Sequence, residues 1–249
     1  MIRVIIYSLA QLTIVISGFS QPVPRIQGGL GSGFAYFALK NELVSSYSQN
    51  GGSAPLQLIF RLNTNQDRHF LQLNYISLAL KSTSQAIKTE DTRVGMQYAY
   101  HRKIGSTKNE FVFYAGLVLD TKTSRRHNTI DGVQTGRNTM GEITTSLSPS
   151  LYIEKSIRND VAGLQCWSAL LTYAVQSGYT LSNPEKMDML GPGEFKELNT
   201  RIFYNKFLTS RIVARVDYQF QVYKISKYET VSSLSHQVVF SLLYNLIIR

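Results

Sequence analysis

Hydrophobic and polar residues alternate with a period of two along most of the chain. The segment 56–63, LQLIFRLN, carries a leucine or phenylalanine at every second position, and 94–101 and 212–222 repeat the pattern. In a β-strand, successive side chains point to opposite faces, so this alternation predicts strands rather than helices. About ten strands are expected, at 30–44, 55–63, 69–81, 93–103, 110–121, 140–155, 162–177, 197–205, 210–225 and 235–249.

The predicted strands are long. Globular strands typically have about 5–6 residues, whereas a tilted strand needs about 9–11 residues to cross a bilayer. The mean hydropathy is −0.10, which suits a soluble protein and equally a membrane barrel with one apolar and one polar face. No segment after residue 20 approaches the roughly 18 apolar residues of a transmembrane helix. Composition therefore leaves a membrane barrel and a soluble β-protein open.

The links between strands alternate in length. Short links at 63–68, 104–109, 156–161 and 205–209 alternate with longer ones at 45–54, 82–92, 122–139, 178–196 and 226–234. Outer-membrane barrels have short periplasmic turns and longer extracellular loops. The rhythm predicts an all-β chain forming a single antiparallel transmembrane β-barrel of about ten strands, with both termini periplasmic. A soluble sandwich or lipocalin-like barrel is the alternative.

The first 20 residues have the pattern of a cleavable signal peptide. Arg3 is followed by an apolar run, and Gly18 and Ser20 supply small residues at a cleavage site. Cleavage would leave residues 21–249 as the barrel domain and lower the net charge from +10 to +9. Cys166 is the only cysteine, so an internal disulfide is excluded and stability must come from packing or from the membrane.

Three features together resemble a small outer-membrane β-barrel of the Bacteroidota type. They are Gly18-Phe19-Ser20 followed by Gln21, the alternating strands, and the terminal stretch VVFSLLYNLIIR. The resemblance implies residence in the outer membrane of a Gram-negative bacterium, with outer-membrane lipids and other outer-membrane or periplasmic proteins as partners. Such barrels usually close on a strand ending in an aromatic residue. This chain ends in Arg249, which departs from that pattern.

The polar register of the strands predicts a charged network inside the barrel. Its expected members are Arg61, His101, Glu142, Glu154, Arg201, Arg211, Arg215 and Asp217. In a barrel of this strand number, side chains fill most of the interior, and buried charges need partners. One interpretation is therefore a plug of arginine–carboxylate pairs. The other is a narrow anion-leaning pore lined by Arg61, Arg201, Arg211 and Arg215.

The two longest links, 122–139 and 178–196, are polar and fit surface loops that contact a partner. Within the first, Arg125, Arg126 and Arg137 could also meet lipid phosphates. The leading hypothesis is a non-enzymatic structural or accessory barrel that presents these loops, in a secretion or uptake assembly. Nucleic acid is not expected as a partner, because the chain is exported and carries no binding motif.

Aromatic residues near strand ends suggest girdles at the membrane interfaces. The tyrosines concerned are Tyr98, Tyr100, Tyr218, Tyr223 and Tyr244. Trp167 is expected on the lipid-exposed side or near an interface.

No catalytic, cofactor-binding or metal-binding motif stands out. A lipid-modifying enzyme would need a nucleophile, a base and an orienting group. Ser235 and His236 are adjacent, so on a strand they point to opposite faces. His101 would need a serine from elsewhere in the barrel. We therefore expect no enzyme, with a lipid-modifying barrel using His101 or His236 as the third hypothesis.

Overall fold

The computed structural model describes residues 25–41, 48–82, 87–108, 110–130, 139–177, 185–227 and 230–246. The predicted signal peptide and its cleavage site lie outside these residues. The described chain forms thirteen antiparallel strands. They are β1 (Arg25–Asn41), β2 (Gln49–Ser53), β3 (Leu56–Asn63), β4 (Asp67–Ser82), β5 (Ile87–Ser106), β6 (Phe111–Ile130), β7 (Thr139–Ile157), β8 (Asp160–Ser168), β9 (Leu171–Ser177), β10 (Glu185–Leu190), β11 (Phe195–Phe207), β12 (Ile212–Ile225) and β13 (Val231–Leu246).

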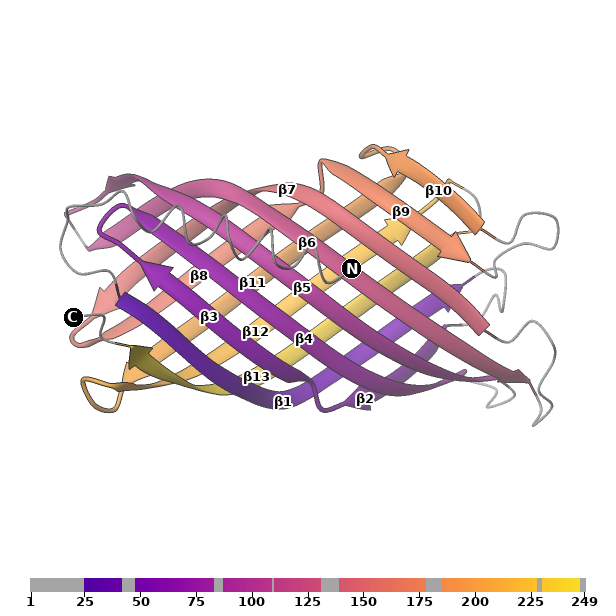
Figure 1. Cartoon of the computed structure of the whole chain (residues 1–249), viewed down its shortest axis with the longest axis horizontal. Helices are drawn as coiled ribbons and strands as arrows, with labels where there is room; N and C mark the ends of the chain where they lie inside the picture. Colours follow the sequence, from indigo (N-terminus) through magenta and orange to yellow (C-terminus); the bar gives the residue numbers. More distant parts are fainter. Residues whose placement is uncertain are drawn as a thin grey trace.

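The strands close into an elongated barrel (Figure 1). Three pairs lie end to end, namely β2 with β3, β8 with β9, and β10 with β11, so the thirteen strands make a ring of ten. Closure comes from β1 and β13, which pair from Ile26 with Leu246 to Asn41 with Val231. β13 also pairs with β12. The strand predicted at 235–249 is thus present up to Leu246 and lies between β12 and β1.

The two ends of the barrel differ, as the link lengths predicted. Residues 64–66, 107–110, 158–159 and 208–211 connect strands at one end, which we call the turn end. At that end Arg158 takes a φ of 57°, as a tight hairpin requires. β1 begins and β13 ends there as well. The longer links leave from the opposite end, the loop end.

Several strands continue further toward the loop end than the alternation predicted. β6 runs to Ile130 and β7 begins at Thr139, so most of the predicted loop 122–139 is wall. β10 likewise occupies part of the predicted loop 178–196. These loop assignments were wrong because 121–130, TKTSRRHNTI, is polar on both faces. Without an apolar face, a strand gives no period-two signal.

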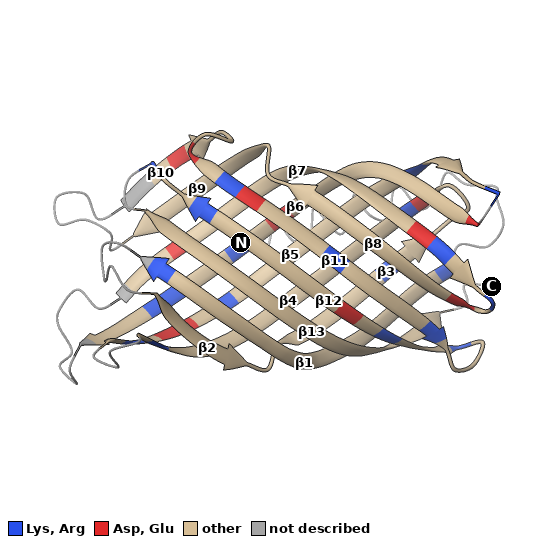
Figure 2. Ribbon diagram, turned by 180° about the vertical axis from the view of Figure 1, so that it is seen from behind, with Lys and Arg blue, Asp and Glu red and all other residues tan. Residues whose placement is uncertain are grey.

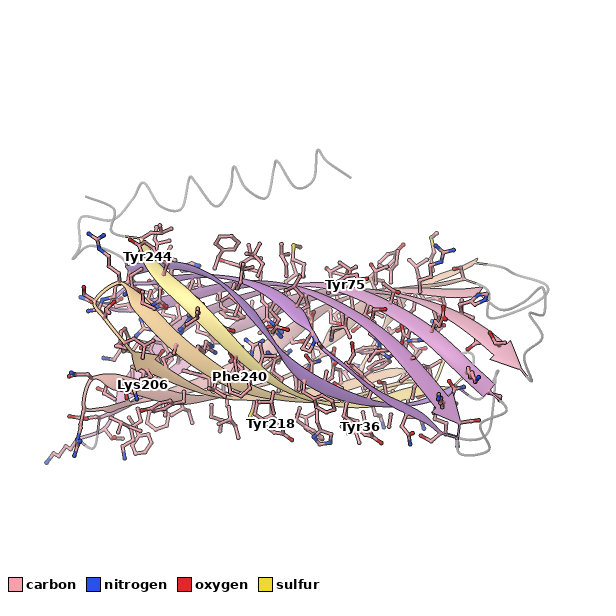
Figure 3. All side chains as sticks on the ribbon, turned by 90° about the horizontal axis from the view of Figure 1, so that it is seen from below. Tyr36, Tyr75, Lys206, Tyr218, Phe240 and Tyr244 are labelled. Atoms are coloured by element: carbon pink, nitrogen blue, oxygen red, sulfur yellow. The ribbon has the colours of Figure 1, made fainter. Side chains whose placement is uncertain are left out.

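The outer surface changes character along the barrel axis. Toward the turn end it is apolar: Leu30, Phe34 and Leu242 are 61–63% exposed, and Phe240 and Tyr244, labelled in Figure 3, lie outside the wall. Toward the loop end the outward positions become polar. On β5, for example, Val94 and Met96 give way to Thr92, Glu90 and Lys88, all exposed. Figure 2 shows many of the charged residues on strand segments toward the two ends of the barrel, with fewer on the segments between them.

The interior changes in the opposite sense. A cluster of buried apolar side chains, here the apolar cluster, fills the barrel near the loop end. It comprises Ala35, Phe37, Leu39, Ile76, Leu78, Leu80, Met140, Ala169, Ala174, Leu190, Phe195, Tyr223, Ile225 and Val231. We call the part of the barrel around this cluster the loop half and the remainder the turn half. The loop half holds this apolar cluster inside, together with buried polar side chains such as Asp91 and Arg126, and polar residues take many of its outward positions. The outer face of the turn half is apolar and suits lipid.

Candidate functional site in the barrel interior

The interior of the turn half is filled by paired charges and aromatic rings. Arg68 and Glu154 lie 3.0 Å apart, and Glu154 also accepts hydrogen bonds from the hydroxyls of Tyr114 and Tyr152 at 3.1 and 2.5 Å. Arg215 donates to both carboxylate oxygens of Asp217, at 2.6 and 2.5 Å. Such two-point contacts are among the stronger ion pairs. This layer therefore blocks the turn end with side chains that fix one another.

Arg201 forms the next layer. Its guanidinium lies over the rings of Phe70 and Trp167, at 4.6 and 5.5 Å from their centroids. Nη2 donates to the side-chain oxygens of Gln72 and Gln97 at 2.7 and 2.8 Å. Arg201 lines a larger cavity on its loop side and a smaller one on its turn side. Its side chain thus forms part of the partition between two internal spaces.

His101 lies beside that partition. Its Nε2 is 2.9 Å from Oγ of Ser150, and both residues are buried. In the sheet, Gly116 pairs with His101 on one side and with Ser150 on the other. The imidazole therefore spans a strand that has no side chain at that level. The sequence could not show that this serine would be the partner of His101.

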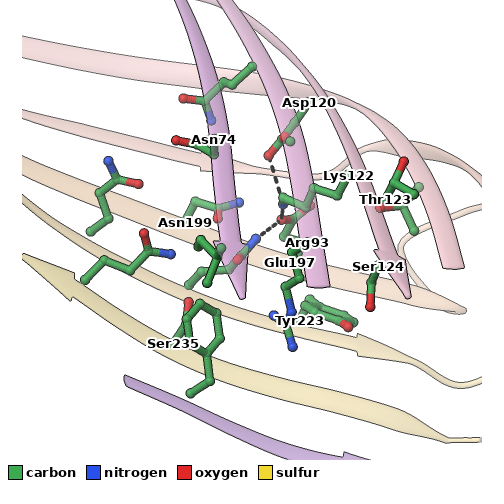
Figure 4. Close-up of a pocket in the computed structure, with 18 of the residues that line it drawn as sticks. Asn74, Arg93, Asp120, Lys122, Thr123, Ser124, Glu197, Asn199, Tyr223 and Ser235 are labelled. Carbon is green, nitrogen blue, oxygen red and sulfur yellow. Dashed lines mark hydrogen bonds and ion pairs between the residues drawn. The ribbon is translucent and has the colours of Figure 1, made fainter. Parts of the chain in front are cut away.

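The larger cavity, here the chamber, surrounds a buried ionic triad. Lys122 lies 2.8 Å from Asp120 and also contacts Glu197 (Figure 4). The Glu197 carboxylate accepts a second hydrogen bond from Gln221 at 2.6 Å. Because two carboxylates share one ammonium, Lys122 is the residue on which this part of the interior depends.

A second network of ion pairs lines the chamber where it meets the apolar cluster. Arg126 reaches Glu142 at 3.3 Å and Asp91 at 3.4 Å, and its Nη2 donates to the Tyr223 hydroxyl at 3.0 Å. Asp91 pairs in addition with Arg93 at 2.7 Å. This network corrects the placement of Arg126, which was expected on a surface loop and is only 1% exposed. Arg125 does face outward, but from β6.

The residues of the predicted interior network fall into two groups. Seven lie inside: Arg61, His101, Glu142, Arg201, Arg215 and Asp217 are buried, and Glu154 is nearly so. Arg211 was placed wrongly. It lies in the turn before β12, exposed, with Nη1 3.5 Å from the Tyr244 hydroxyl. The strand was expected to begin at residue 210, but β12 begins at Ile212. Arg211 therefore lies in a turn and does not point into the barrel.

Sequence reasoning missed half of the charged interior. Arg68, Asp91, Arg93, Asp120, Lys122, Arg126 and Glu197 all take part in its ion pairs. Arg68, Asp91, Lys122 and Arg126 lie in segments taken for links, whereas Arg93, Asp120 and Glu197 lie at the ends of predicted strands. The alternation in 117–126 carried a signal for part of this group, because Asp120, Lys122, Ser124 and Arg126 are every second residue of one strand. Reading it required knowing that β6 continues.

Two aromatic placements, Trp167 and Tyr223, differ from expectation. Trp167 is buried in the interior beside Ala99 and Val118. Tyr223 is buried rather than part of an interfacial girdle. His236 faces outward, where its Nδ1 lies 2.7 Å from the Tyr218 hydroxyl. The described residues contain no group of His, Cys, Asp and Glu that could hold a metal ion. In the same residues, no helix is long and apolar enough to cross a membrane.

The fold can be compared with known proteins. The outer membrane protease OmpT from Escherichia coli has a similar structure, with a TM-score of 0.58 and 7% identity over 92% of this chain and 99% of that one. The translocator domain of the autotransporter NalP from Neisseria meningitidis gives a TM-score of 0.49 with 7% identity, over 96% of this chain and 95% of that one. No protein-family model and no curated protein matches the chain.

The class of protein follows from the ring of strands, the lipid-type outer face of the turn half and the likeness to OmpT. The chain has the fold of an outer-membrane β-barrel, a single antiparallel barrel with ten wall positions. At 7% identity this likeness concerns the fold alone.

Proposed function

We propose that this protein is a closed, non-enzymatic outer-membrane barrel that serves as a structural or accessory subunit and presents its loop end to a partner protein. In this arrangement the turn end is periplasmic and the loop end extracellular. The partner belongs to a secretion or uptake assembly, and outer-membrane lipids surround the turn half.

The observation that carries the proposal is the inversion of polarity along the axis. Apolar residues with exposed side chains on β5 run from Val94 to Ile104, interrupted by Arg102, a span that matches the roughly 9–11 residues that cross a bilayer. The seven residues Ile87–Arg93 continue the same strand beyond that belt. A wall that extends past the membrane and is filled with an apolar core is a rigid support for the loops above it.

The interior argues against the pore alternative. Among the described residues, seven cationic side chains face six carboxylates inside the barrel, and most are paired. The net charge summed over the interior is therefore small, whereas an anion pore needs positive charge along its whole length. The apolar cluster adds side chains that cannot replace an ion's hydration shell.

Site-specific photo-crosslinking tests the accessory role in the native membrane. A crosslinking residue replaces Arg125, which is exposed on β6 opposite Thr92, or Leu117, exposed on the turn half of β6. We expect position 125 to give a protein adduct, identified by mass spectrometry, and position 117 to give none with the same partner. A barrel that purifies alone and gives no adduct from position 125 would contradict the proposal.

Conductance tests the closed interior separately. Purified barrel inserted into planar bilayers should give no steady current in potassium chloride. A reproducible open level, reduced by substitution of Arg201 but not of exposed Arg211, would favour the pore instead.

A further inference from the structure

The smaller cavity lies between the Arg201 layer and the turn end. It is lined by Arg61, Arg68, Arg201, Arg215, His101 and Tyr152, among others. It offers about 20 Å³ to the centre of a water-sized sphere. One such sphere needs about 10–15 Å³, so the cavity has room for one or two waters or one monatomic ion.

The charges around this cavity do not balance. Four guanidiniums line it, and the carboxylates that pair with them are Glu154 on Arg68 and Asp217 on Arg215. Arg61 and Arg201 form no ion pair with any carboxylate in the described part of the chain, although they are only 7% and 2% exposed. Two buried positive charges without a counter-charge carry a large desolvation cost.

Aromatic rings hold three of these guanidiniums close together. Arg201 and Arg215 both lie over Phe70, at 4.6 and 5.9 Å. Arg215 and Arg61 both lie over Phe203, at 4.3 and 5.9 Å. Ring faces stabilise each cation, but they do not remove the repulsion between neighbouring cations. The rings therefore keep like charges at close range around one cavity.

Hydrogen-bonding capacity also remains in this group. Nε of Arg201 is buried and has no acceptor among the described residues. The Arg61 guanidinium makes contacts of only 3.5 Å, to Gln27 Oε1 and the Tyr152 hydroxyl. Those distances are at the outer limit for a hydrogen bond. The Arg61 guanidinium and the Nε of Arg201 are thus cationic donors at this cavity without a strong acceptor.

We propose that this cavity binds one halide-sized anion, with chloride as the physiological candidate, held mainly by Arg61 and Arg201. The anion supplies the missing charge and accepts charge-assisted hydrogen bonds. The cavity's size favours a monatomic ion over phosphate or a lipid headgroup. The site is a resident structural site, so it is independent of the accessory role and of any conduction.

Stability in matched salts provides the test. Purified barrel in detergent micelles is unfolded with urea in sodium chloride or sodium bromide, and in sodium gluconate at the same ionic strength. Above the dissociation constant, each tenfold rise in halide should raise the folded-to-unfolded ratio about tenfold. Gluconate, too large for the cavity, should give no such dependence. Equal behaviour in chloride and gluconate would overturn the proposal.

Two variants localise the effect. Arg61→Gln and Arg201→Gln should each reduce or abolish the halide dependence. Arg211→Gln removes the same charge from an exposed turn and should leave the dependence intact. If the halide dependence persists in both interior variants, the ion binds elsewhere and the proposed site is wrong.

A crystallographic measurement on the wild-type barrel keeps the proposal testable if the interior variants do not fold. Crystals grown in bromide should give an anomalous peak between Arg61 and Arg201. A cavity without bromide signal at saturating salt would refute the assignment.

Discussion

His101 Nε2 lies 2.9 Å from Ser150 Oγ inside the barrel. A histidine this close to a serine hydroxyl has the contact of a catalytic pair. The setting is different, because both side chains are at most 4% exposed and the adjoining cavity admits only one or two waters. We therefore interpret the contact as a buried structural hydrogen bond.

The structural interpretation makes a prediction for His101→Ala and Ser150→Ala. Each should lower the free energy of unfolding by about 1–3 kcal/mol, because a buried polar group loses its partner. Neither should change hydrolysis of phospholipid or ester substrates, which should stay at background in the wild type. His236→Ala, on the outer face, serves as the matched control. Wild-type hydrolysis that disappears in either interior variant would establish an enzyme.

Gly116, which pairs with His101 on one side and Ser150 on the other, is predicted to tolerate no side chain. A Cβ at this position would lie 1.8 Å from the Tyr100 carbonyl oxygen and 2.7 Å from the His101 Cα. Because these are backbone atoms, Gly116→Ala must distort the β5–β6 pairing. We expect a loss of at least about 1–3 kcal/mol, as for overpacked cores, measured by urea unfolding in micelles.

Gly95 offers the control for that prediction. Its added Cβ would meet the nearest atoms at 3.7–3.8 Å, an ordinary contact, so Gly95→Ala should be tolerated. Similar stability of the two alanine variants would show that the wall is more plastic at Gly116 than its geometry indicates.

The Lys122 triad should behave as one unit. Lys122→Met leaves Asp120 and Glu197 buried without their shared cation, which we expect to cost about 3–5 kcal/mol. Adding Asp120→Asn and Glu197→Gln should recover much of that loss, since the charges are then gone. Urea unfolding of the single and triple variants measures both effects. A neutral Lys122→Met would mean that the carboxylates are already solvated or protonated.

The sequence predicted the barrel because its signal lies in the lipid-facing residues. Leu56, Leu58 and Phe60 alternate with inward residues, and ten such segments with alternating link lengths define a ring. The charged interior was predictable only where an apolar outer face marked the strand, as for Arg61 and Arg201. Contacts between strands that are not direct neighbours, such as His101 with Ser150, depend on the register of several strands, which no single strand encodes.

The loop half shows the same limit from the other side. Arg126 and Asp91 lie on strands whose outward neighbours are polar, so nothing in the local pattern distinguishes wall from loop. Leu78 and Leu80 were correctly placed on a strand, but the apolar register was expected to face lipid. They face inward instead, because in the loop half of β4 the apolar residues occupy the inward positions and pack in the apolar cluster.

That inversion of polarity can be tested on a single strand. Met96 and Thr92 both point outward from β5 and are exposed, and Thr92 lies four residues nearer the loop end. If the bilayer surrounds only the turn half, Met96→Lys places a charge in lipid and Thr92→Lys places one in water. Met96→Lys should cost about 2–4 kcal/mol near the midplane and less toward an interface. Thr92→Lys should stay within about 0.5 kcal/mol of the wild type. Unfolding from lipid vesicles measures both variants. Equally large costs would mean that the bilayer reaches Thr92, and equally small costs that it does not surround Met96. Either result would contradict a membrane boundary between these two residues.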